Sequence, residues 1–204
     1  MMRRVLIGCE CSGIIREAFR RRGVDAWTAD YKGAEDGSKF HFQGDALWFV
    51  ENDAPFDLFI VHPPCQFLSS SGLHWNKRRP ERAAQTEAAY RFATRCISAP
   101  IDRLCMENPI GCLSTRIRKP EQIIQPYQFG EDASKATCLW LNNLPPLQPT
   151  RYIAPRIVDG RKRWANQTDS GQNRLGPSPE RAADRARTYL GIAEAMAEQW
   201  TPLL

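Results

Sequence analysis

One cysteine stands where the chain could hold a nucleophile rigidly. Cys65 belongs to the segment His62-Pro63-Pro64-Cys65-Gln66, which directly follows the apolar run Phe56–Val61. A run of this length predicts a buried strand of a parallel sheet, and the double proline predicts a stiff turn at its end. A thiolate fixed in this way is suited to covalent catalysis, such as addition to C6 of a cytosine before its C5 is alkylated. From these residues alone, a structural cysteine in a proline turn is the alternative.

A carboxylate follows the next expected strand. Glu107 stands after Arg103-Leu104-Cys105-Met106 and is followed by Asn108-Pro109. A carboxyl group in that position could hydrogen-bond N3 and the exocyclic amine of a cytosine, and so promote addition at C6. Taken alone, Glu107 could equally be a loop carboxylate that caps a turn.

Small and acidic residues mark a candidate nucleotide-binding edge. Residues 8–13, Gly-Cys-Glu-Cys-Ser-Gly, form a turn between an expected strand and an expected helix, where backbone N–H groups can approach a ligand closely. Asp30 could bind two ribose hydroxyls, and Gly44-Asp45 could bind an adenine amine; helix capping or a surface turn is the alternative for both carboxylates. The candidate cofactor-binding residues are Gly8, Cys9, Glu10, Ser12, Gly13, Asp30, Asp45 and Pro63.

Alternating strand and helix patterns must position these residues. Strands are expected at 4–8, 24–29, 56–61, 104–106, 123–129 and 137–141, and helices at 14–23, 45–51, 81–98 and 179–200. For the last helix, Ser178 is the expected N-cap and Pro179 the first helical residue. This alternation predicts an α/β fold with a mostly parallel sheet and helices on both faces. The carboxyl ends of such strands converge, so we expect the 9–13 turn, Asp30, Cys65 and Glu107 at one edge.

Composition fits one globular domain spanning residues 1–204, with 42% hydrophobic and 25% charged residues. No apolar run approaches the length of a membrane span, so no membrane partner is expected, and the N-terminus does not resemble a signal peptide. Seven cysteines at irregular spacings, without a CxxC pair, predict reduced thiols, no metal site and a cytoplasmic setting. The net charge of +5 permits a polyanionic partner. The basic residues cluster in Lys77-Arg78-Arg79 with Arg82, in Arg116, Arg118 and Lys119, and in Arg161-Lys162-Arg163.

In combination, these signals resemble the DNA cytosine-5 methyltransferase family. Pro64-Cys65-Gln66 matches the family's proline-cysteine-glutamine signature, and Glu107-Asn108-Pro109 stands where the family has Glu-Asn-Val. The resemblance covers residues 5–112 and runs in the family's order. It implies a Rossmann-like fold, S-adenosylmethionine as cofactor and DNA as partner. It further implies methyl transfer to C5 of a flipped-out cytosine through a covalent bond between Cys65 and C6.

The second half of the chain resembles the family less. Lys135 is the only cation where the family carries a Gln-x-Arg-x-Arg block, and Glu10 stands where it usually has glycine. A carboxylate of Glu10 that pointed into the site would bind the methionine ammonium. Gly176-Pro177-Ser178-Pro179 resembles a Gly-Asn-Ser-Val element, and the helix within 178–204 is expected to pack back on the domain.

The region between residues 142 and 177 is short for target recognition. It reads as loops, so sequence readout is expected to be limited, or shared with a protein partner or a second subunit. Its tryptophan, Trp164, is expected to stack on a base. The candidate substrate-binding residues are Gln66, Ser69, Asn108, Lys135, Arg163 and Trp164. Compact chains of this kind resemble phage methylases, which would act in the cytoplasm of a bacterium or a phage-infected host, for example in restriction-modification.

Other functions remain open at this point. One is C5 modification of a free pyrimidine nucleotide or transfer of a group other than methyl, since thymidylate synthases also place a cysteine after a proline-containing turn. Their next residue is usually histidine, whereas Gln66 follows here. Another is a nucleic-acid-binding protein that has kept the fold without catalysis. Methylation of an amino group fits less well, because those enzymes favour Asp/Asn-Pro-Pro-aromatic.

Overall fold

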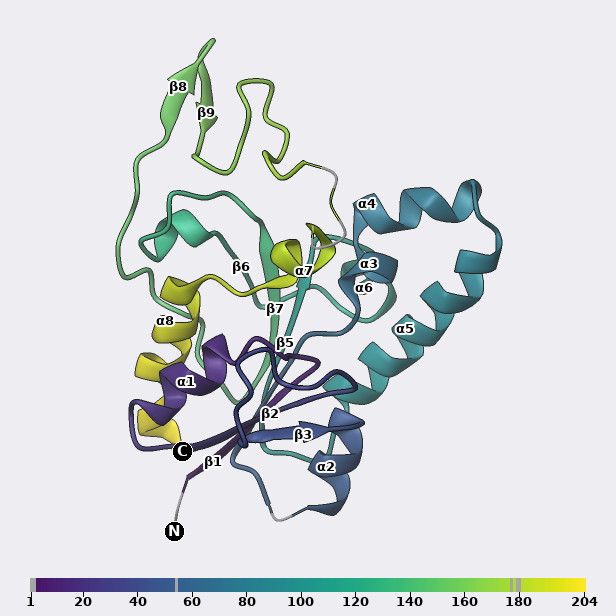
Figure 1. Ribbon diagram of the computed structural model, residues 1–204, viewed down its shortest axis with the longest axis vertical. Coiled ribbons are helices and arrows are strands. Elements are labelled where there is room, and N and C mark those ends of the chain that lie inside the picture. The colour runs from purple at the N-terminus through teal and green to yellow at the C-terminus, as the bar shows by residue number, and fades with distance from the viewer. Residues whose placement is uncertain (1–2, 54, 177, 179–180) are drawn as a thin grey trace.

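Seven strands form one sheet in the computed structural model, which describes residues 3–53, 55–176, 178 and 181–204, without the side chains of 182 and 183 (Figure 1). The order is β3-β2-β1-β4-β5-β7-β6, and only β7 runs antiparallel to its neighbours. This is the sheet of the Rossmann-like, S-adenosylmethionine-dependent methyltransferase fold, so the predicted fold class is confirmed. The strands are β1 (Arg4–Gly8), β2 (Asp25–Asp30), β3 (His41–Gln43), β4 (Leu58–Val61), β5 (Arg103–Pro109), β6 (Gln122–Ile124) and β7 (Thr137–Asn142).

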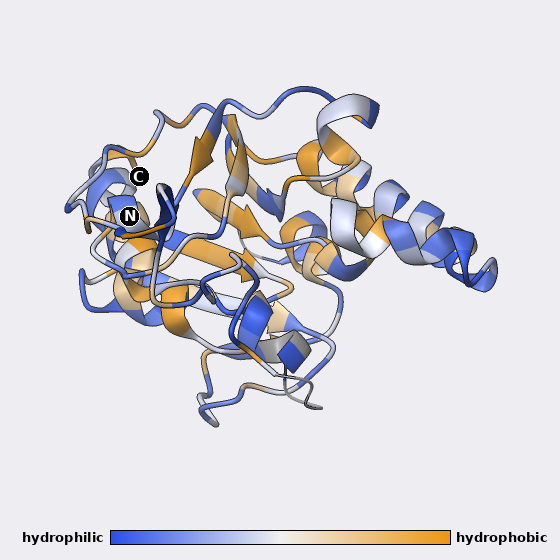
Figure 2. Cartoon of the chain, turned by 90° about the horizontal axis from the view of Figure 1, so that it is seen from above, coloured by the Kyte–Doolittle hydropathy of each residue, from blue (hydrophilic) through white to orange (hydrophobic). Residues whose placement is uncertain are grey.

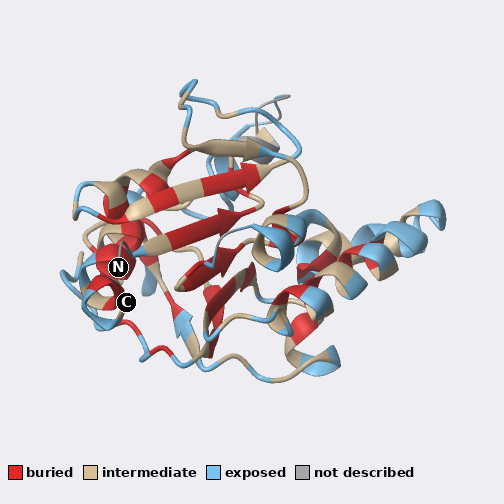
Figure 3. Cartoon of the chain, turned by 90° about the horizontal axis from the view of Figure 1, so that it is seen from below, coloured by how far each residue is buried: buried red, intermediate tan, exposed pale blue. Residues whose placement is uncertain are grey.

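Helices cover both faces of the sheet. Figure 1 shows α1 (Ile14–Arg20) and α8 (Leu190–Trp200) on one face, and α2 (Ala46–Asn52) and α5 (Glu81–Ile97) on the other. Each face has its own hydrophobic cluster, and the strands between them are the most buried part of the molecule (Figure 3). None of the described helices is both long enough and apolar enough to cross a bilayer.

The central strand β4 aligns the ends of its two neighbours. All four of its residues are fully buried, because β1 and β5 pair with its two edges and helices cover its faces. Val61 is in register with Gly8 of β1 and with Met106 of β5. The next residues along the three strands, Cys9, His62 and Glu107, therefore stand side by side at the carboxyl edge.

A buried arginine fixes the first helix and the loop beside it. Gly13 precedes α1 with a φ of 76°, a left-handed conformation that favours glycine. The guanidinium of Arg16 is fully buried; it donates to Thr28 Oγ1 at 3.2 Å and also forms an ion pair with Asp36. Asp36 belongs to the loop 31–39, so this ion pair holds the loop against α1.

The turn after β4 is held by unusually close backbone contacts. It forms α3 (Cys65–Leu68) and α4 (Ser70–Leu73), followed by the 3-10 turn η1 (His74–Lys77). A Cβ atom at Gly72 would lie 2.1 Å from the carbonyl oxygen of Gln66, and one at Gly111 would lie 2.0 Å from that of Leu68. Only glycine fits at these two positions. Beyond α4, η1 and the start of α5 project from the body as a hydrophilic arm (Figure 2).

The second half departs from the expected pattern at a strand, at a hairpin and in the C-terminal helix. The strand expected at 123–129 ends at Ile124, and the 3-10 turn η2 (Pro126–Gln128) follows. Residues 142–177 contain a hairpin, β8 (Arg156–Val158) and β9 (Arg161–Arg163), where only loops were expected. Two other short helical elements are α6 (Leu113–Arg116) and η3 (Thr201–Leu203).

The single C-terminal helix expected at 179–200 is wrong, because it is broken in two. It forms α7 (Arg181–Ala186) and α8, with a non-helical segment, 187–189, between them. Ser178 Oγ accepts the backbone N–H of Arg181 at 3.0 Å, as a capping residue would. Pro177 and Pro179 lie outside the described residues. Helix α8 packs against α1, where Glu194 pairs with Arg21 and, at 2.6 Å, with Arg22.

A glycine at the start of α8 provides a test of this packing. A Cβ at Gly191 would lie 1.8 Å from the carbonyl oxygen of Phe129, whereas one at Gly33 would meet nothing within 4 Å. We expect Gly191→Ala to lower the free energy of unfolding by about 2 kcal/mol or more through overpacking. Gly33→Ala should change it by less than about 0.5 kcal/mol. Urea denaturation of both variants measures this; equal stabilities would show that α8 is not seated as described.

Candidate active site

Three side chains from neighbouring strand ends meet at the carboxyl edge. Cys65 is the first residue of α3 and is half-buried, and His62 directly follows β4. The His62 Nδ1 atom lies 3.2 Å from Oε2 of Glu107, and the two side chains are 13% and 17% exposed. Glu107 was expected after its strand, but β5 continues to Pro109 because β7 pairs with it as far as that residue. Glu107 therefore projects from a rigid strand.

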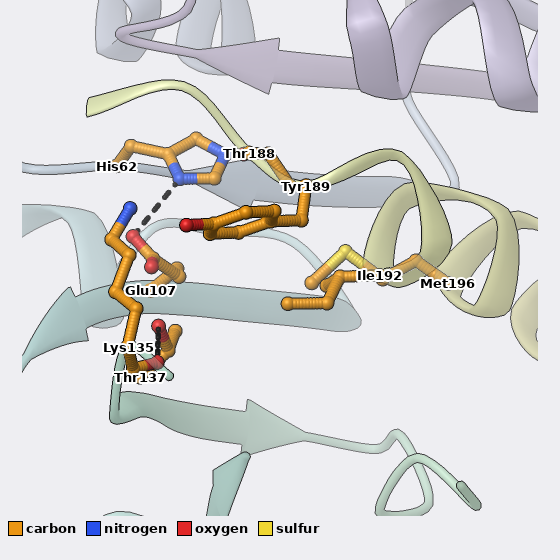
Figure 4. Close-up of a pocket in the computed structure, with 8 residues that line it drawn as sticks. All are labelled: His62, Glu107, Lys135, Thr137, Thr188, Tyr189, Ile192 and Met196. Atoms are coloured by element: carbon orange, nitrogen blue, oxygen red, sulfur yellow. Dashed lines mark hydrogen bonds and ion pairs between the residues drawn. The ribbon is translucent and has the colours of Figure 1, made fainter. Parts of the chain in front are cut away.

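A small pocket adjoins the Glu107 carboxylate (Figure 4). Its volume is about 10 Å³, which is near the minimum for one water molecule. One side comes from the sheet edge and the other from the C-terminal segment. The lining residues are His62, Glu107, Lys135, Thr137, Thr188, Tyr189, Ile192 and Met196. A base needs far more room than this pocket offers.

Opposing charges act on the Cys65 thiol. Burial and the Glu107 carboxylate raise its pKa, whereas the cations Lys135 and Arg185 lower it. The raising effects prevail, so the pKa lies above the ordinary value for a cysteine. The thiol is therefore mostly protonated at neutral pH, and its reactivity depends on the charges around it.

The Glu107 carboxyl group responds differently to its surroundings. Burial raises its pKa, but the hydrogen bond and charge of His62, the charge of Lys135 and a bond from Thr137 together outweigh burial. The net effect lowers the pKa below the ordinary value. Glu107 is therefore ionised at neutral pH, and it loses that ionisation only as the pH falls through its lowered pKa.

The candidate cofactor residues gather at the adjacent strand ends. Cys9 has a φ of 58°, and its N–H donates to the carbonyl of Ala29 at 2.7 Å. Burial, Asp30 and Asp45 raise the pKa of Cys9 to about 12, which shows that both carboxylates lie near this thiol. Asp30 Oδ1 accepts the N–H of Lys32 at 2.9 Å, and Asp45 caps α2 through the N–H of Leu47 at 3.0 Å. The capping alternative is thus observed for Asp45.

Glu10 lies inside the turn between β1 and α1. It is 8% exposed; its Oε1 accepts the N–H of Gly13 at 2.8 Å and the hydroxyl of Ser12. Its Oε2 is buried and has no hydrogen-bond partner among the described residues. An unpaired buried carboxylate oxygen can accept hydrogen bonds from an ammonium group. This turn therefore fits the amino-acid end of S-adenosylmethionine. Gly8 is buried, and a Cβ there would come within 2.8 Å of Ala46 and Phe59.

Three of the expected ligand-binding residues, Asn108, Pro63 and Ser69, make hydrogen bonds within the protein. Asn108 is fully buried, and its Nδ2 donates to the carbonyl of Pro63 at 2.7 Å; Pro63 is itself buried. This bond joins β5 to the turn that carries Cys65. Ser69 is 9% exposed, and its Oγ caps α4 by accepting the N–H of Gly72 at 3.2 Å. Gln66 is exposed beside Cys65, and Lys135 lines the pocket; these two remain candidates.

Trp164 does not present its ring for stacking on a base. It is 8% exposed, stacks on Tyr127 with ring centroids 4.3 Å apart, and donates from Nε1 to the carbonyl of Ile153. The expectation of base stacking is therefore corrected: Trp164 packs the root of the hairpin. Arg163 donates at 2.9 Å to the carbonyls of Asp169 and Lys162, so it braces the hairpin, whereas Arg161 and Lys162 are exposed.

Sequence reasoning missed His62, Tyr189 and Arg185. The position of His62, directly after a buried strand and before Pro63, was a usable signal for a functional residue. Tyr189 gave no signal, because the pattern around it reads as continuous helix. No group of three or more His, Cys, Asp or Glu side chains in the described part of the chain could hold a metal ion.

Comparisons with known proteins bear on the fold. No model of a protein family matches the chain, and no curated protein matches it. Solved structures that resemble it include a protein assigned as a DNA modification methyltransferase encoded within an Escherichia coli prophage. It shares 16% identity and a TM-score of 0.47 over 77% of this chain and 53% of that chain.

Two further structures resemble the chain. The Entamoeba histolytica methyltransferase EhMeth shares 11% identity, with a TM-score of 0.44 over 76% of this chain and 58% of that chain. A triple mutant of Spodoptera frugiperda DNMT2 shares 15% identity, with a TM-score of 0.43 over 79% and 57%. The chain thus spans little more than half the length of these proteins. The fold assignment above rests on the strand order of the sheet.

The charges around Cys65 predict how fast it reacts. Because the Glu107 carboxylate raises the pKa of Cys65, Glu107→Gln should increase the thiolate fraction and speed alkylation by iodoacetamide at pH 7.5. Lys135→Ala removes a lowering charge and should slow it; we expect changes of about threefold to tenfold, since one pKa unit is tenfold in thiolate. Peptide mass spectrometry follows Cys65, with half-buried Cys112 as the internal reference. The reverse order of rates would contradict the charge arrangement.

The bond between Asn108 and Pro63 predicts a loss of stability. Asn108→Ala leaves the buried Pro63 carbonyl unpaired and should lower the free energy of unfolding by about 1–3 kcal/mol. Asn52→Ala is the matched control, because the Asn52 side chain makes an exposed bond at the end of α2 and should matter by less than about 0.5 kcal/mol. Urea denaturation decides; indistinguishable variants would show that the bond does not hold the turn.

Proposed function

We propose that the protein transfers a methyl group from S-adenosylmethionine to C5 of cytosine in DNA. The observation that carries the proposal is the proximity of Cys65 and Glu107. Cys65 begins α3 just beyond β4, Glu107 lies on the neighbouring strand β5, and the Glu107 carboxylate acts on the Cys65 thiol. A nucleophile and a carboxylate at the carboxyl edge of a methyltransferase-type sheet are the groups that C5 chemistry on cytosine needs.

Cys65 is the proposed nucleophile. Its thiolate adds to C6 of the base, the C5–C6 π electrons shift toward C4, and N3 takes a proton, which makes C5 nucleophilic. Glu107 binds the base at N3 and the exocyclic amine and stabilises the charge that develops there. S-adenosylmethionine, when bound, supplies an electrophilic methyl group for C5. Loss of the C5 proton then lets the Cys65 thiolate leave, and this restores the enzyme.

Residues at the ends of β1 and β2 are proposed to hold the cofactor. Glu10 would bind its ammonium group through the unpaired Oε2, and Asp30 would bind ribose hydroxyls. Asp45 lies near Cys9 and Asp30, but its Oδ1 already caps α2, which leaves its second oxygen for an adenine amine. The Ser12 hydroxyl and the Gly13 backbone N–H both donate to Glu10 and so orient its carboxylate.

DNA is the proposed substrate, and its phosphates would meet exposed cations of α7 and of the β8–β9 hairpin. Arg185 of α7 is exposed and near enough to act on Cys65, and Arg161 and Lys162 are exposed on the hairpin. The target base would leave the stack to reach Cys65. Because 142–177 offers one short hairpin, we propose that sequence readout is limited or shared with a partner or second subunit, in the cytoplasm of a bacterium or a phage-infected host.

Methyl transfer to DNA tests the proposal directly. Tritiated S-adenosylmethionine should label DNA, and nucleoside analysis should place the label in 5-methyldeoxycytidine. Cys65→Ser should reduce transfer by at least about 10³-fold, as loss of a covalent nucleophile does. Cys112→Ser, at another half-buried cysteine, should keep the wild-type rate.

The outcomes separate the alternatives. Transfer that survives Cys65→Ser would sink the covalent mechanism, and label on an amino group would exclude C5 chemistry. Labelling of dCMP in preference to DNA would instead identify a free nucleotide as the substrate. Calorimetry that shows no binding of S-adenosylmethionine would indicate a protein without catalysis.

A further inference from the structure

The proposed reaction needs a proton that Glu107 does not hold. When the Cys65 thiolate adds to C6, N3 of the base must take up a proton for C5 to become nucleophilic. Glu107 faces that position, but His62, Lys135 and Thr137 stabilise its ionised form. An ionised carboxylate can accept hydrogen bonds from the base and has no proton to give. Another group must therefore supply the proton.

His62 is bonded directly to that carboxylate. It stands one residue beyond β4, where its backbone N–H donates to the carbonyl of Gly8 at 3.1 Å. Its Nδ1 lies 3.2 Å from Glu107 Oε2, and its side chain is 13% exposed. The His62 backbone is thus held by Gly8 and the His62 ring by Glu107, and the side chain is largely shielded from solvent.

The other groups that face this pair are less suited to the task. The Lys135 ammonium acts on Glu107 through its charge, and its Nζ lies 3.5 Å from the carbonyl of Arg187. Tyr189 lines the same pocket, but burial and Glu131 raise its pKa, so it gives up a proton reluctantly. The charge of Arg185 acts on the Cys65 thiol. Among the titratable side chains described, His62 is the one hydrogen-bonded to Glu107.

We propose that His62 is a positioning residue, which orients the Glu107 carboxylate through Nδ1 and holds the proton that N3 of the target cytosine takes up. This inference rests on the proposed function. The bond from Nδ1–H holds Oε2 of Glu107. The Nε2 atom is buried and has no partner among the described residues, so the ring is not anchored elsewhere by a competing side chain.

The proton and electrons balance in this step. The thiolate pair of Cys65 forms the S–C6 bond, and the C5–C6 π pair shifts to C4–C5 while the C4–N3 π pair takes the proton at N3. His62 passes the proton on its Nδ1 to Glu107, Glu107 passes a proton on to N3, and His62 is left neutral while Glu107 is again ionised. When a water molecule takes the C5 proton, the C5–H pair reforms the C5–C6 double bond and the thiolate leaves, and N3 returns its proton through Glu107 to His62.

Two substitutions of His62 distinguish its proposed role in holding a proton from a role in orienting Glu107 alone. His62→Asn keeps an N–H donor at the position of Nδ1 but cannot titrate, and His62→Leu removes the donor. Both should bind DNA and S-adenosylmethionine like the wild type. In single-turnover methyl transfer we expect His62→Asn to be slower by about 10²-fold, the usual range for a lost general acid, and His62→Leu to be slower still. His74→Asn, on exposed η1, is the matched control and should keep the wild-type rate.

The pH dependence is the readout that a structural role would not change. The wild-type rate should rise with pH as Cys65 ionises and then fall once the Glu107–His62 pair holds no proton to supply, whereas His62→Asn should only rise. A wild-type rate and a bell-shaped profile in His62→Asn would overturn the inference. So would loss of DNA or cofactor binding in His62→Asn together with an unchanged profile shape.

A spectroscopic measurement does not depend on turnover. In protein labelled with ¹⁵N-histidine, the signal absent from His62→Asn identifies His62, and its Nδ1 should carry a proton at neutral pH. A bare Nδ1 overturns the inference even if the wild type transfers no methyl group. If the wild type transfers methyl groups and Cys65→Ser does not, the proposed function stands, and the His62 variants then decide this inference alone.

Discussion

The parallel pairing of β4 with β1 and β5 is the constraint on which the site depends. Because Val61 is in register with both Gly8 and Met106, the residues that follow them are brought to one edge whatever their side chains. Cys9 turns toward Asp30 and Asp45, His62 meets Glu107, and the turn beyond His62 carries Cys65. A one-residue slip of β4 would move each of its side chains into the hydrophobic cluster on the opposite face, so the register is strongly specified.

A hydrogen bond between β5 and the turn after β4 makes the site rigid. Asn108 binds the carbonyl of Pro63, so the strand that bears Glu107 also holds the turn before Cys65. The charges are set against one another: Glu107 disfavours the Cys65 thiolate, while Lys135 and Arg185 favour it. A thiol that ionises only when the surrounding charges allow is protected from unwanted reaction, and binding of a polyanion or a base at this edge would alter the balance.

Sequence patterns predicted β1, β2, β4, α1, α2 and α5 in the first half of the chain, but they did not predict β3 or the short helices α3 and α4, and they failed where distant contacts decide. The strands around Cys65 are apolar runs, and this composition predicts that they are buried. The expected ends of these strands predicted that Cys65, Glu107 and Asp30 lie at one edge of the sheet. Helical periodicity over 179–200 could not reveal the break at 187–189, where Arg187 pairs with Glu35 at 2.8 Å and its carbonyl accepts from Lys135. Trp164 was misread for the same reason: its partner Tyr127 is remote in the sequence.

The close contacts at Gly72 and Gly111 restrict which sequences can carry this site. At both positions a backbone carbonyl occupies the space of a side chain, so no compensating change in a neighbouring side chain can admit a larger residue. Libraries that aim to alter the substrate range can therefore vary exposed Gln66, but should leave these glycines fixed. In distant homologues, glycines at the positions of Gly72 and Gly111, which both pack against the turn that carries Cys65, would be as informative a marker as the cysteine itself. They would indicate that the backbone follows the same path, whatever the chemistry.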